Sequence, residues 1–330
     1  MYQVSKKISI SLINAMIYFG FMELIKDLST WEAPYAASAL TLGNFDGVHL
    51  GHRTLIKRVR ERGQDCNIPS VVMTFDPHPL RFLFPQKNFK NLFTLGDRIE
   101  QISKLNPDYL VILKFDHSLS ELSPSNFFSH ILVNKLKVQQ LMLGHDFSFG
   151  KNRSGSLQTL EDLCNSSNLQ MEVIKPVMVD STIVSSSEIR DCIEEGDVFR
   201  ASGFLGRPFA LSGTVTRGAE RGRTIGFPTA NLKATSEFFP KIGVYVTQTL
   251  VGTRSFRSVT NVGFNPTFVS SAEVPPVQIE THILNFEEDI YGQKIEVRFF
   301  DFIRAEIKFS STEKLVSQIR EDVEKAAEWK

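Results

Sequence analysis

Strand-like and helix-like segments alternate from residue 38 to about residue 177, and this alternation constrains the fold more than any other feature. Segments with strand character are SALTLG (38–43), SVVMTF (70–75), YLVILKF (109–115), QQLMLG (139–144) and MEVIKPV (171–177). Segments with helical character stand between them: GHRTLIKRVRERG (51–63), TLGDRIEQISKL (94–105), PSNFFSHILVNKL (124–136) and SLQTLEDLCNSS (156–167). Strands that alternate with helices of this length predict an α/β domain with a parallel sheet covered on both faces.

The pattern changes after about residue 188, where strand-like segments follow one another with turns rich in Gly, Pro and Asn. They are FALSGTVT (209–216), GVYVTQTLV (243–251), FRSVTNV (256–262), QIETHILNF (278–286) and KIEVRFFDFI (294–303), with no helices expected between them. This pattern predicts an antiparallel barrel or sandwich. A terminal helix is expected after it, because Leu315, Ile319 and Val323 recur at i, i+4 spacing and Ser311 or Thr312 can cap its start.

The N-terminus carries Lys6 and Lys7 before the apolar stretch ISISLINAMIYFGF (8–21), as in the first two regions of a signal peptide. The stretch is too short and too polar for a membrane-spanning helix, and no small-residue cleavage pattern follows it. The sequence from Met22 onward resembles the natural start of a protein. We therefore expect residues 1–21 to be a poorly ordered extension or a misassigned start. The expected domains are then residues 22–187, a helical connector over 188–205 that stops near Gly203, and residues 206–330.

Composition excludes some classes of partner. The 330 residues, 42% of them hydrophobic, suffice for about two domains with real cores. A formal net charge of +0 argues against a nucleic-acid or membrane partner held by bulk electrostatics, although a local basic pocket for a small anion remains possible. Cys66, Cys164 and Cys192 show neither zinc spacing nor a disulfide framework, so a cytoplasmic protein is expected. The sequence leaves the oligomeric state open.

The stretch LGNFDGVHLGH (42–52) joins the first expected strand to the first expected helix. A helix N-terminus gathers unbonded N–H groups and a positive partial charge, and glycines at 43, 47 and 51 would let a bulky anion approach the backbone. His49 and His52 face one way on the first turn and can donate hydrogen bonds to phosphate oxygens, as phosphoryl transfer requires. The alternative is a turn that the histidines only cap. A metal site is disfavoured because no third ligand stands nearby.

Four motifs in this region, in this order, resemble those of bacterial bifunctional riboflavin kinase/FMN adenylyltransferases. They are GNFDGVHLGH (43–52), TFDPHP (74–79), GHDFSFG (144–150) and VSSSEIR (184–190), the last with Ser187 where that family more often has threonine. The resemblance covers essentially the whole chain after Met22. It implies a Rossmann-like HxGH nucleotidyltransferase fold for the α/β domain and a riboflavin kinase-like barrel for the C-terminal domain.

The resemblance also implies roles for residues of the first domain. His49 and His52 would bind ATP phosphates and stabilise the pentavalent transition state. Further ATP and phosphate contacts are implied for Gly43, Asn44, Phe45, Asp46, Gly47, Ser185, Ser186 and Arg190. Of these, Asp46 could instead hold the loop through backbone bonds, and the Arg190 guanidinium suits departing pyrophosphate. A flavin pocket is implied for Asp76, His78, Asp146 and Phe149. Without the resemblance, SSSEIR reads as a helix cap with a surface arginine, and DPHP as a turn.

A second constellation lies in GRTIGFPTANL (222–232), which by itself is a long turn. The side chains of Thr229 and Asn231 are short and carry oxygen, which suits Mg²⁺ and phosphate. The segment resembles the GxxxGFPTAN motif of riboflavin kinases, and VTRGAERGR (215–223) resembles the flexible Gly-rich segment that covers their nucleotide. The resemblance implies that Gly222, Gly226, Thr229 and Asn231 bind ATP phosphate, with Thr229 and Asn231 also at the metal.

A general base is implied on the strand QIETHIL (278–284), where Glu280 and His282 share one face. A solvated polar face is the plain alternative. Similar kinases use a glutamate here to deprotonate the ribityl 5′-hydroxyl, and Glu280 is the match. Arg304, in a segment similar to LRxExxF, is implied to contact flavin or phosphate. Asn261 and Pro266, in a segment similar to NxGxxPTF, are interpreted as structural.

The implied function is a pair of reactions in one chain. The barrel would phosphorylate riboflavin with ATP to FMN, and the α/β domain would adenylylate FMN to FAD with release of pyrophosphate and without a protein nucleophile. ATP would arrive with Mg²⁺, and the flavins would be substrate and product, so no tightly bound organic cofactor is expected. One alternative is an FMN adenylyltransferase whose barrel only senses flavin or mediates oligomerisation; intact Thr229, Asn231 and Glu280 argue against it. A nucleic-acid-binding barrel is disfavoured by the neutral charge.

Overall fold

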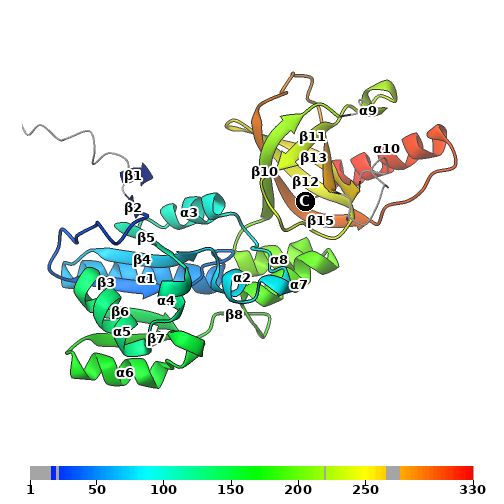
Figure 1. The fold of residues 1–330 in the computed structure, drawn as a ribbon. Coiled ribbons are helices and arrows are strands. Elements are labelled where there is room, and N and C mark those ends of the chain that lie inside the picture. Colours follow the sequence, from blue (N-terminus) through cyan, green and yellow to red (C-terminus); the bar gives the residue numbers. More distant parts are fainter. Residues whose placement is uncertain (1–15, 20–21, 219–220, 265–275, 330) are drawn as a thin grey trace, which may run out of the picture. The chain divides into compact units, whose positions relative to one another are not determined.

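The computed structural model describes residues 16–19, 22–218, 221–264 and 276–329. They divide into two compact units, the first ending at Val184 and the second beginning at Ser185 (Figure 1). None of the helices in these ranges combines the length and the apolar character needed to cross a membrane.

The first unit is built on a seven-stranded sheet with the order β1-β2-β5-β4-β3-β6-β7. The strands are β1 (Met16–Phe19), β2 (Met22–Ile25), β3 (Ser38–Leu42), β4 (Ser70–Asp76), β5 (Tyr109–Lys114), β6 (Val138–Gly144) and β7 (Gln170–Ile174). All neighbouring strands are parallel except β1, which pairs antiparallel with β2. The predicted parallel sheet is confirmed. Part of the segment expected to be a poorly ordered extension is a strand of this sheet.

Helices connect these strands, as the alternation predicts. They are α1 (Leu50–Cys66), α2 (Pro79–Leu83), α3 (Leu95–Ser103), α4 (His117–Ser120), α5 (Pro124–Asn126) and α6 (Leu157–Ser166), with the shorter η2 (Pro85–Lys87) and η4 (Lys151–Arg153). The helix expected over 124–136 is α5 followed by the π-helical segment η3 (Phe127–Lys135). A small hairpin of β8 (Met178–Val179) and β9 (Thr182–Ile183) completes the unit.

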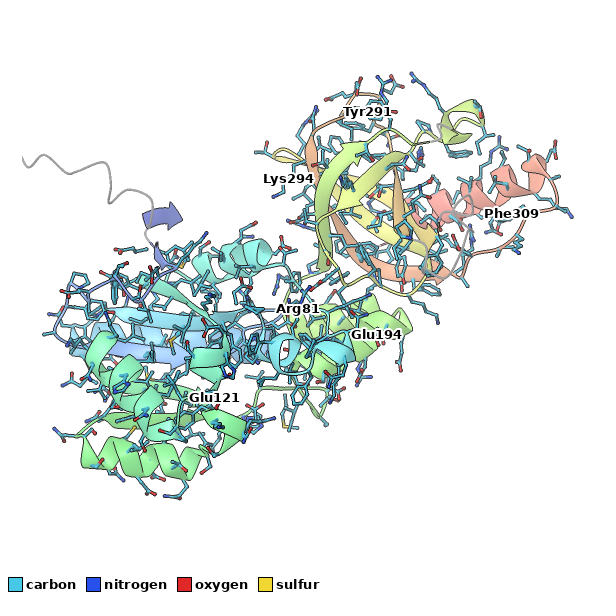
Figure 2. All side chains as sticks on the ribbon, in the orientation of Figure 1. Arg81, Glu121, Glu194, Tyr291, Lys294 and Phe309 are labelled. Atoms are coloured by element: carbon cyan, nitrogen blue, oxygen red, sulfur yellow. The ribbon has the colours of Figure 1, made fainter. Side chains whose placement is uncertain are left out.

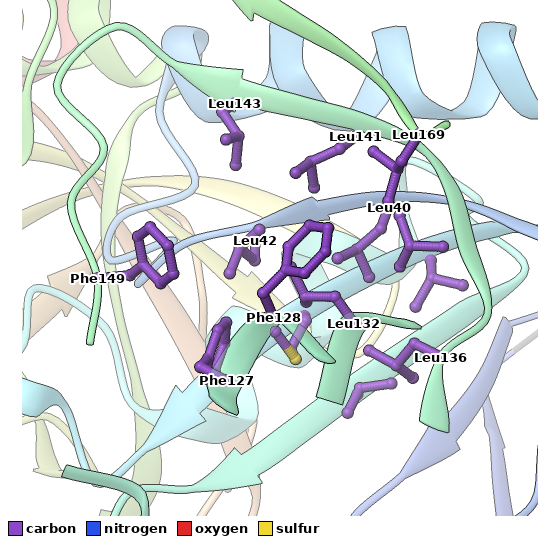
Figure 3. Close-up of a cluster of buried hydrophobic side chains, with 14 of the residues drawn as sticks. Leu40, Leu42, Phe127, Phe128, Leu132, Leu136, Leu141, Leu143, Phe149 and Leu169 are labelled. Carbon is purple, nitrogen blue, oxygen red and sulfur yellow. The ribbon is translucent and has the colours of Figure 1, made fainter. Parts of the chain in front are cut away.

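Two hydrophobic cores form in the first unit, because alternate residues of a strand point to opposite faces of the sheet. Leu40 and Leu42 of β3 enter a cluster with Phe127, Phe128 and other residues drawn in Figure 3. Ala39 of the same strand enters a separate cluster with residues of α1 and α3. Both faces of the sheet are therefore buried, and side chains that act on ligands are left to the strand ends.

The second unit begins with two helices, α7 (Ser186–Glu195) and α8 (Val198–Leu205). The helical connector expected over 188–205 falls on these two helices, and Gly203 lies inside α8. The helix ends at Leu205, and its C-cap residue Gly206 has a φ of 68°, in the left-handed region that suits glycine at a C-terminus.

The rest of the second unit is a closed barrel with the strand order β10-β11-β14-β13-β12-β15, so the barrel alternative is confirmed over the sandwich. Its strands are β10 (Phe209–Thr216), β11 (Ala230–Ala234), β12 (Gly243–Val251), β13 (Arg254–Phe264), β14 (Val277–Ile283) and β15 (Lys294–Arg304). A four-residue helix, α9 (Arg221–Thr224), lies where none was expected. The predicted terminal helix is α10 (Thr312–Glu328), and Ser311 caps it by accepting a hydrogen bond from the Lys314 N–H.

Candidate functional sites

His49 and His52 lie face to face at the start of α1, after the loop that connects it to β3. Their ring centroids are 3.6 Å apart with 21° between the planes. His49 is the N-cap residue of α1, its Nδ1 accepts from the His52 N–H at 3.4 Å, and only 6% of the residue is exposed. The capping alternative is therefore true of His49, and it fixes the ring beside the helix N-terminus. A Cβ on Gly51 would come 3.1 Å from the His49 ring, so glycine leaves the space in which that ring lies.

The loop before His49 has an unusual backbone. Phe45, Gly47 and Val48 have φ angles of 48°, 88° and 41°. Residues other than glycine seldom adopt such angles, and they persist where the surroundings hold them. Successive N–H groups in left-handed and turn conformations form concavities that bind anions. Together with the positive end of α1, the loop is suited to phosphate.

Asp46 and Arg98 support this loop from the protein interior. The Asp46 carboxylate, in a residue only 2% exposed, accepts hydrogen bonds from the N–H groups of Leu92 at 3.0 Å and Phe93 at 3.4 Å. Arg98 on α3 is 4% exposed and donates to the Asn44 carbonyl at 2.7 Å. Burial lowers the pKa of the Arg98 guanidinium, whereas the neighbouring carboxylates, Asp46 among them, act in the opposite direction. Sequence reasoning did not single out Arg98.

The residues expected to line a flavin pocket lie at or after the C-terminal ends of β4 and β6. Asp76 and His78 lie at the C-terminal end of β4, where His78 Nδ1 accepts from the Leu80 N–H at 3.1 Å. The His78 ring stacks on Phe89 at 4.3 Å. Asp146 is exposed in the turn after β6. Phe149 belongs to the core drawn in Figure 3, with 8% of its surface exposed, and so offers little area to a ligand.

Exposed apolar side chains surround α2, immediately after His78. Leu80, Phe82, Leu83 and Phe84 are 37–46% exposed, and they share this short segment with Arg81, which Figure 2 labels. An apolar patch of this kind is a surface that a planar aromatic ligand can cover.

Ser185, Ser186 and Arg190 lie at the start of α7, in the second unit. The Ser185 hydroxyl accepts from the Glu188 N–H at 3.2 Å, which is the cap that the SSSEIR pattern predicts. Arg190 is half-buried and donates from Nη1 to the Ser186 carbonyl at 3.3 Å.

Glu280 stands between two amide side chains on neighbouring barrel strands. In the register of the barrel it pairs with Asn231 of β11 on one side and with Asn261 of β13 on the other. Ile279, Thr281 and Ile283 are buried inside the barrel, so the Glu280 face is the outer one. Directly paired residues on one face of a sheet have Cβ atoms about 4.5–5.5 Å apart, so these three side chains are neighbours.

The Asn231 amide is packed tightly. A Cβ on Gly218 would lie 2.3 Å from Asn231 Nδ2, so glycine is needed at this approach. Asn231 Oδ1 is buried and accepts no hydrogen bond from any residue that the structure describes. A buried polar atom in that state is costly unless a ligand or water completes it.

The turn before β11 is fixed to β14. His282 Nδ1 lies 2.8 Å from the Pro228 carbonyl, and its ring meets Phe227 edge to face at 5.5 Å. Gly226 has φ 88°, and a Cβ on Gly222 would lie 2.3 Å from the Phe227 carbonyl. These contacts fix the turn in which Thr229 lies, immediately before β11, whose Asn231 pairs with Glu280. The expected flexible segment over the nucleotide includes residues 219–220, which lie outside the described residues.

Asn261 and Arg304 have contacts that the sequence reading did not foresee. Asn261 Nδ2 donates to Glu306 Oε1 at 3.2 Å, so a second carboxylate reaches the Glu280 face. Arg304 Nη2 lies 2.8 Å from Asp322 Oδ2, and the pair joins β15 to α10 with 16% of the arginine side chain exposed. Only this exposed part of the Arg304 side chain is available for contact with a flavin. Pro266 lies outside the described residues.

In the described ranges no three His, Cys, Asp or Glu side chains are grouped as a metal site would require. Thr229, Asn231 and Glu280 offer a hydroxyl, an amide oxygen and a carboxylate, which are the hard oxygen ligands of Mg²⁺ and its hydration shell. The unsatisfied Asn231 Oδ1 fits such a cation.

Comparisons with known proteins assign both units. Residues 32–188 match the family described as FAD synthetase, and residues 205–330 match riboflavin kinase. A bifunctional riboflavin kinase/FMN adenylyltransferase from Haemophilus influenzae is 35% identical over 306 residues, which are 92% of this chain and 98% of the relative. The enzyme of that description from Listeria monocytogenes is 36% identical over 86% of this chain and 89% of its own length.

A solved structure also resembles the chain. It comes from Streptococcus pneumoniae, is described as a macrolide-efflux protein, and is 30% identical over 94% of this chain and 100% of its own, with a TM-score of 0.83. The matches to these relatives extend over both units of the chain. The chain belongs to the family of bifunctional riboflavin kinase/FMN adenylyltransferases.

Proposed function

We propose that the two activities of this enzyme reside in two separate sites, a riboflavin kinase site around Glu280 and an FMN adenylyltransferase site around His49 and His52. The observation that carries the proposal is that the register of β11, β14 and β13 places Glu280 directly between Asn231 and Asn261. The proposal follows the curated relatives rather than the efflux description of the Streptococcus pneumoniae structure, because the kinase and adenylyltransferase motifs are both present in this chain.

At the kinase site, Glu280 accepts the proton of the ribityl 5′-hydroxyl as its oxygen attacks the γ-phosphorus of ATP, and ADP leaves. General-base catalysis of this kind is worth about 10²–10⁴-fold. Asn231 and Asn261 are neutral, so Glu280 is the charged member of the three. Mg²⁺ bound with ATP would neutralise phosphate charge, and Thr229 and Asn231 are the residues that would hold it. Gly222 and Gly226 shape the turn that brings these two residues to the phosphates.

At the adenylyltransferase site, a phosphate oxygen of FMN attacks the α-phosphorus of ATP, and pyrophosphate leaves. No protein atom becomes bonded to the substrate. His49, His52, the N–H groups of residues 43–47 and the positive end of α1 stabilise the charge that develops on the phosphorus oxygens. The exposed apolar side chains of α2, with Asp76 before them, are proposed to receive the flavin, and His78, which is only 4% exposed, lies between them.

The substrates are then riboflavin, FMN and ATP, and the product of the first site is the substrate of the second. We place the reactions in the cytoplasm, which the three free cysteines support.

The test separates the two sites in one chain. Glu280→Ala should lower FMN formation from riboflavin by at least about 10²-fold and leave FAD formation from supplied FMN unchanged. His49→Ala combined with His52→Ala should do the reverse. Glu288→Ala and His130→Ala are matched controls, because both residues are exposed, Glu288 in the connection between β14 and β15 and His130 on η3. Equal loss of both activities in either variant would contradict the two-site proposal.

A further inference from the structure

Arg98 is a buried cation that joins the ends of two strands. Its Nη1 donates to the Asn44 carbonyl at 2.7 Å, just after β3, and its Nη2 donates to the Phe75 carbonyl at 3.0 Å, near the end of β4. One planar guanidinium therefore spans the two strand ends that carry GNFDGVHLGH and TFDPHP. A lysine donates from one nitrogen only, so it cannot place a separate nitrogen on each of the two carbonyls as the guanidinium does.

The burial of this charge needs an explanation. Arg98 lies on the apolar face of α3 beside Ile99 and Ile102, which are buried in the core. Taking a cation out of water costs several kcal/mol, and a well-packed apolar side chain usually does as well or better for stability. Such a side chain would fill the space on α3 but would leave the Asn44 carbonyl with the Thr74 hydroxyl, at 3.0 Å, as its donor.

The hydrogen bond from Arg98 to the Asn44 carbonyl determines the direction in which the N–H groups of the loop of residues 43–47 point. The Asn44–Phe45 peptide bond is trans, so its C=O and N–H point in opposite directions. Arg98 and Thr74 both draw the carbonyl toward the interior, and the Phe45 N–H consequently points the other way. Phe45 is also the residue at which the left-handed backbone leading to His49 begins.

We propose that Arg98 is a positioning residue of the adenylyltransferase site, which holds the loop of residues 43–47 and the N-terminus of α1 in the geometry that phosphoryl transfer requires. This inference rests on the proposed function of that site. Arg98 touches no substrate in this account; it acts through the Asn44 and Phe75 carbonyls. Donors that are misplaced by a fraction of an ångström weaken the transition state more than the bound ground state, so the effect belongs in kcat.

The decisive variant is Arg98→Lys, which keeps the charge and removes the fork. We expect kcat for FAD formation from FMN to fall at least about tenfold, with KM for FMN and ATP changed by less than about threefold. Riboflavin kinase activity of the same sample should stay at the wild-type value. Arg58→Lys is the matched control, because Arg58 also makes a side-chain pair within the first unit, with Glu172, but on the solvent side of α1.

A structural role alone would give a different result. It would lower the thermal midpoint and the amount of active enzyme, and kcat per folded molecule would not change. The inference is overturned if Arg98→Lys keeps kcat within about twofold of wild type, or if its loss matches the loss of folded protein. Arg98→Met would remove the charge together with the fork, and if that variant fails to fold, the lysine variant still decides the question. His52→Ala assayed in parallel identifies failure of the proposed site itself, because that variant would then keep FAD formation.

Discussion

Replacement of Arg304 tests whether this residue contacts flavin, as the sequence resemblance implies, or holds the barrel to its terminal helix. Asp322, its partner on α10, is 2% exposed, and the Arg304 side chain is 16% exposed. Arg304 Nε lies 3.1 Å from each carboxylate oxygen, and Nη2 lies 2.8 Å from Oδ2. The guanidinium also lies 5.8 Å from the ring centroid of Phe309, in the segment between β15 and α10 (Figure 2).

Arg304→Met would leave the Asp322 carboxylate with the Gln318 amide, at 3.3 Å, as its remaining donor in the described part of the chain. Removing one partner of a buried ion pair costs about 3–5 kcal/mol, because the other charge stays buried without compensation. We therefore expect the free energy of unfolding of the C-terminal unit to fall by about that amount. The double variant Arg304→Met/Asp322→Leu should recover at least about 2 kcal/mol of it.

Urea unfolding followed by Trp329 fluorescence measures this loss. Trp329 follows α10 and packs on Phe300 with ring centroids 4.8 Å apart, so its emission reports release of the helix. A Trp31→Phe background removes the only other tryptophan of the chain. Arg254→Met is the matched control: Arg254 makes two 2.7 Å bonds to Glu288, but both side chains are more than half exposed.

The control should change the midpoint little, since water replaces an exposed pair. The reasoning is refuted if Arg304→Met leaves the unfolding midpoint unchanged. A loss of riboflavin affinity at unchanged stability would instead restore the flavin contact that the sequence implied.

Two further predictions concern residues that support the sites. Gly218→Ala would put a Cβ 2.3 Å from Asn231 Nδ2, so riboflavin kinase activity should fall at least about tenfold, while FAD formation from FMN is kept. Riboflavin kinase rates at the wild-type level would show that the Asn231 amide has no fixed role. Asp46→Asn removes the charge of the carboxylate that accepts hydrogen bonds from the Leu92 and Phe93 N–H groups. The free energy of unfolding of the first unit, measured in urea, should therefore fall by about 1–3 kcal/mol. An unchanged unfolding midpoint would contradict the supporting role assigned to Asp46.

Much of the fold follows from the sequence because hydrophobic periodicity is a local property. Alternation of strand and helix patterns sufficed for the parallel sheet, and unbroken strand patterns sufficed for the barrel. The strand β11 (Ala230–Ala234) was not foreseen because its first three residues lie inside the segment 222–232, which was interpreted as a turn. Gly203 and Gly206 both lie near the end of α8, and only the backbone shows which one is left-handed.

The candidate sites were foreseen in part, and the limit is physical. Motif residues such as His49 and His52 are close in sequence, so their spacing indicates a shared function. Arg98 acts on backbone carbonyls, which leave no mark on the sequence, although an arginine among Leu95, Ile99 and Ile102 on an apolar helix face was an available signal. Asn261 and Glu306 are 45 residues apart, and only closure of the barrel brings them together.

Complementation between two inactive variants tests the central claim most directly. Glu280→Ala and the double variant His49→Ala/His52→Ala are each incubated with riboflavin, ATP and Mg²⁺, separately and mixed, and the flavins are separated over time by chromatography. We predict that the first variant alone leaves riboflavin unchanged, the second alone stops at FMN, and the mixture makes FAD through released FMN. A mixture that makes no FAD, or a single variant that makes it at the wild-type rate, would contradict two independent sites in this chain.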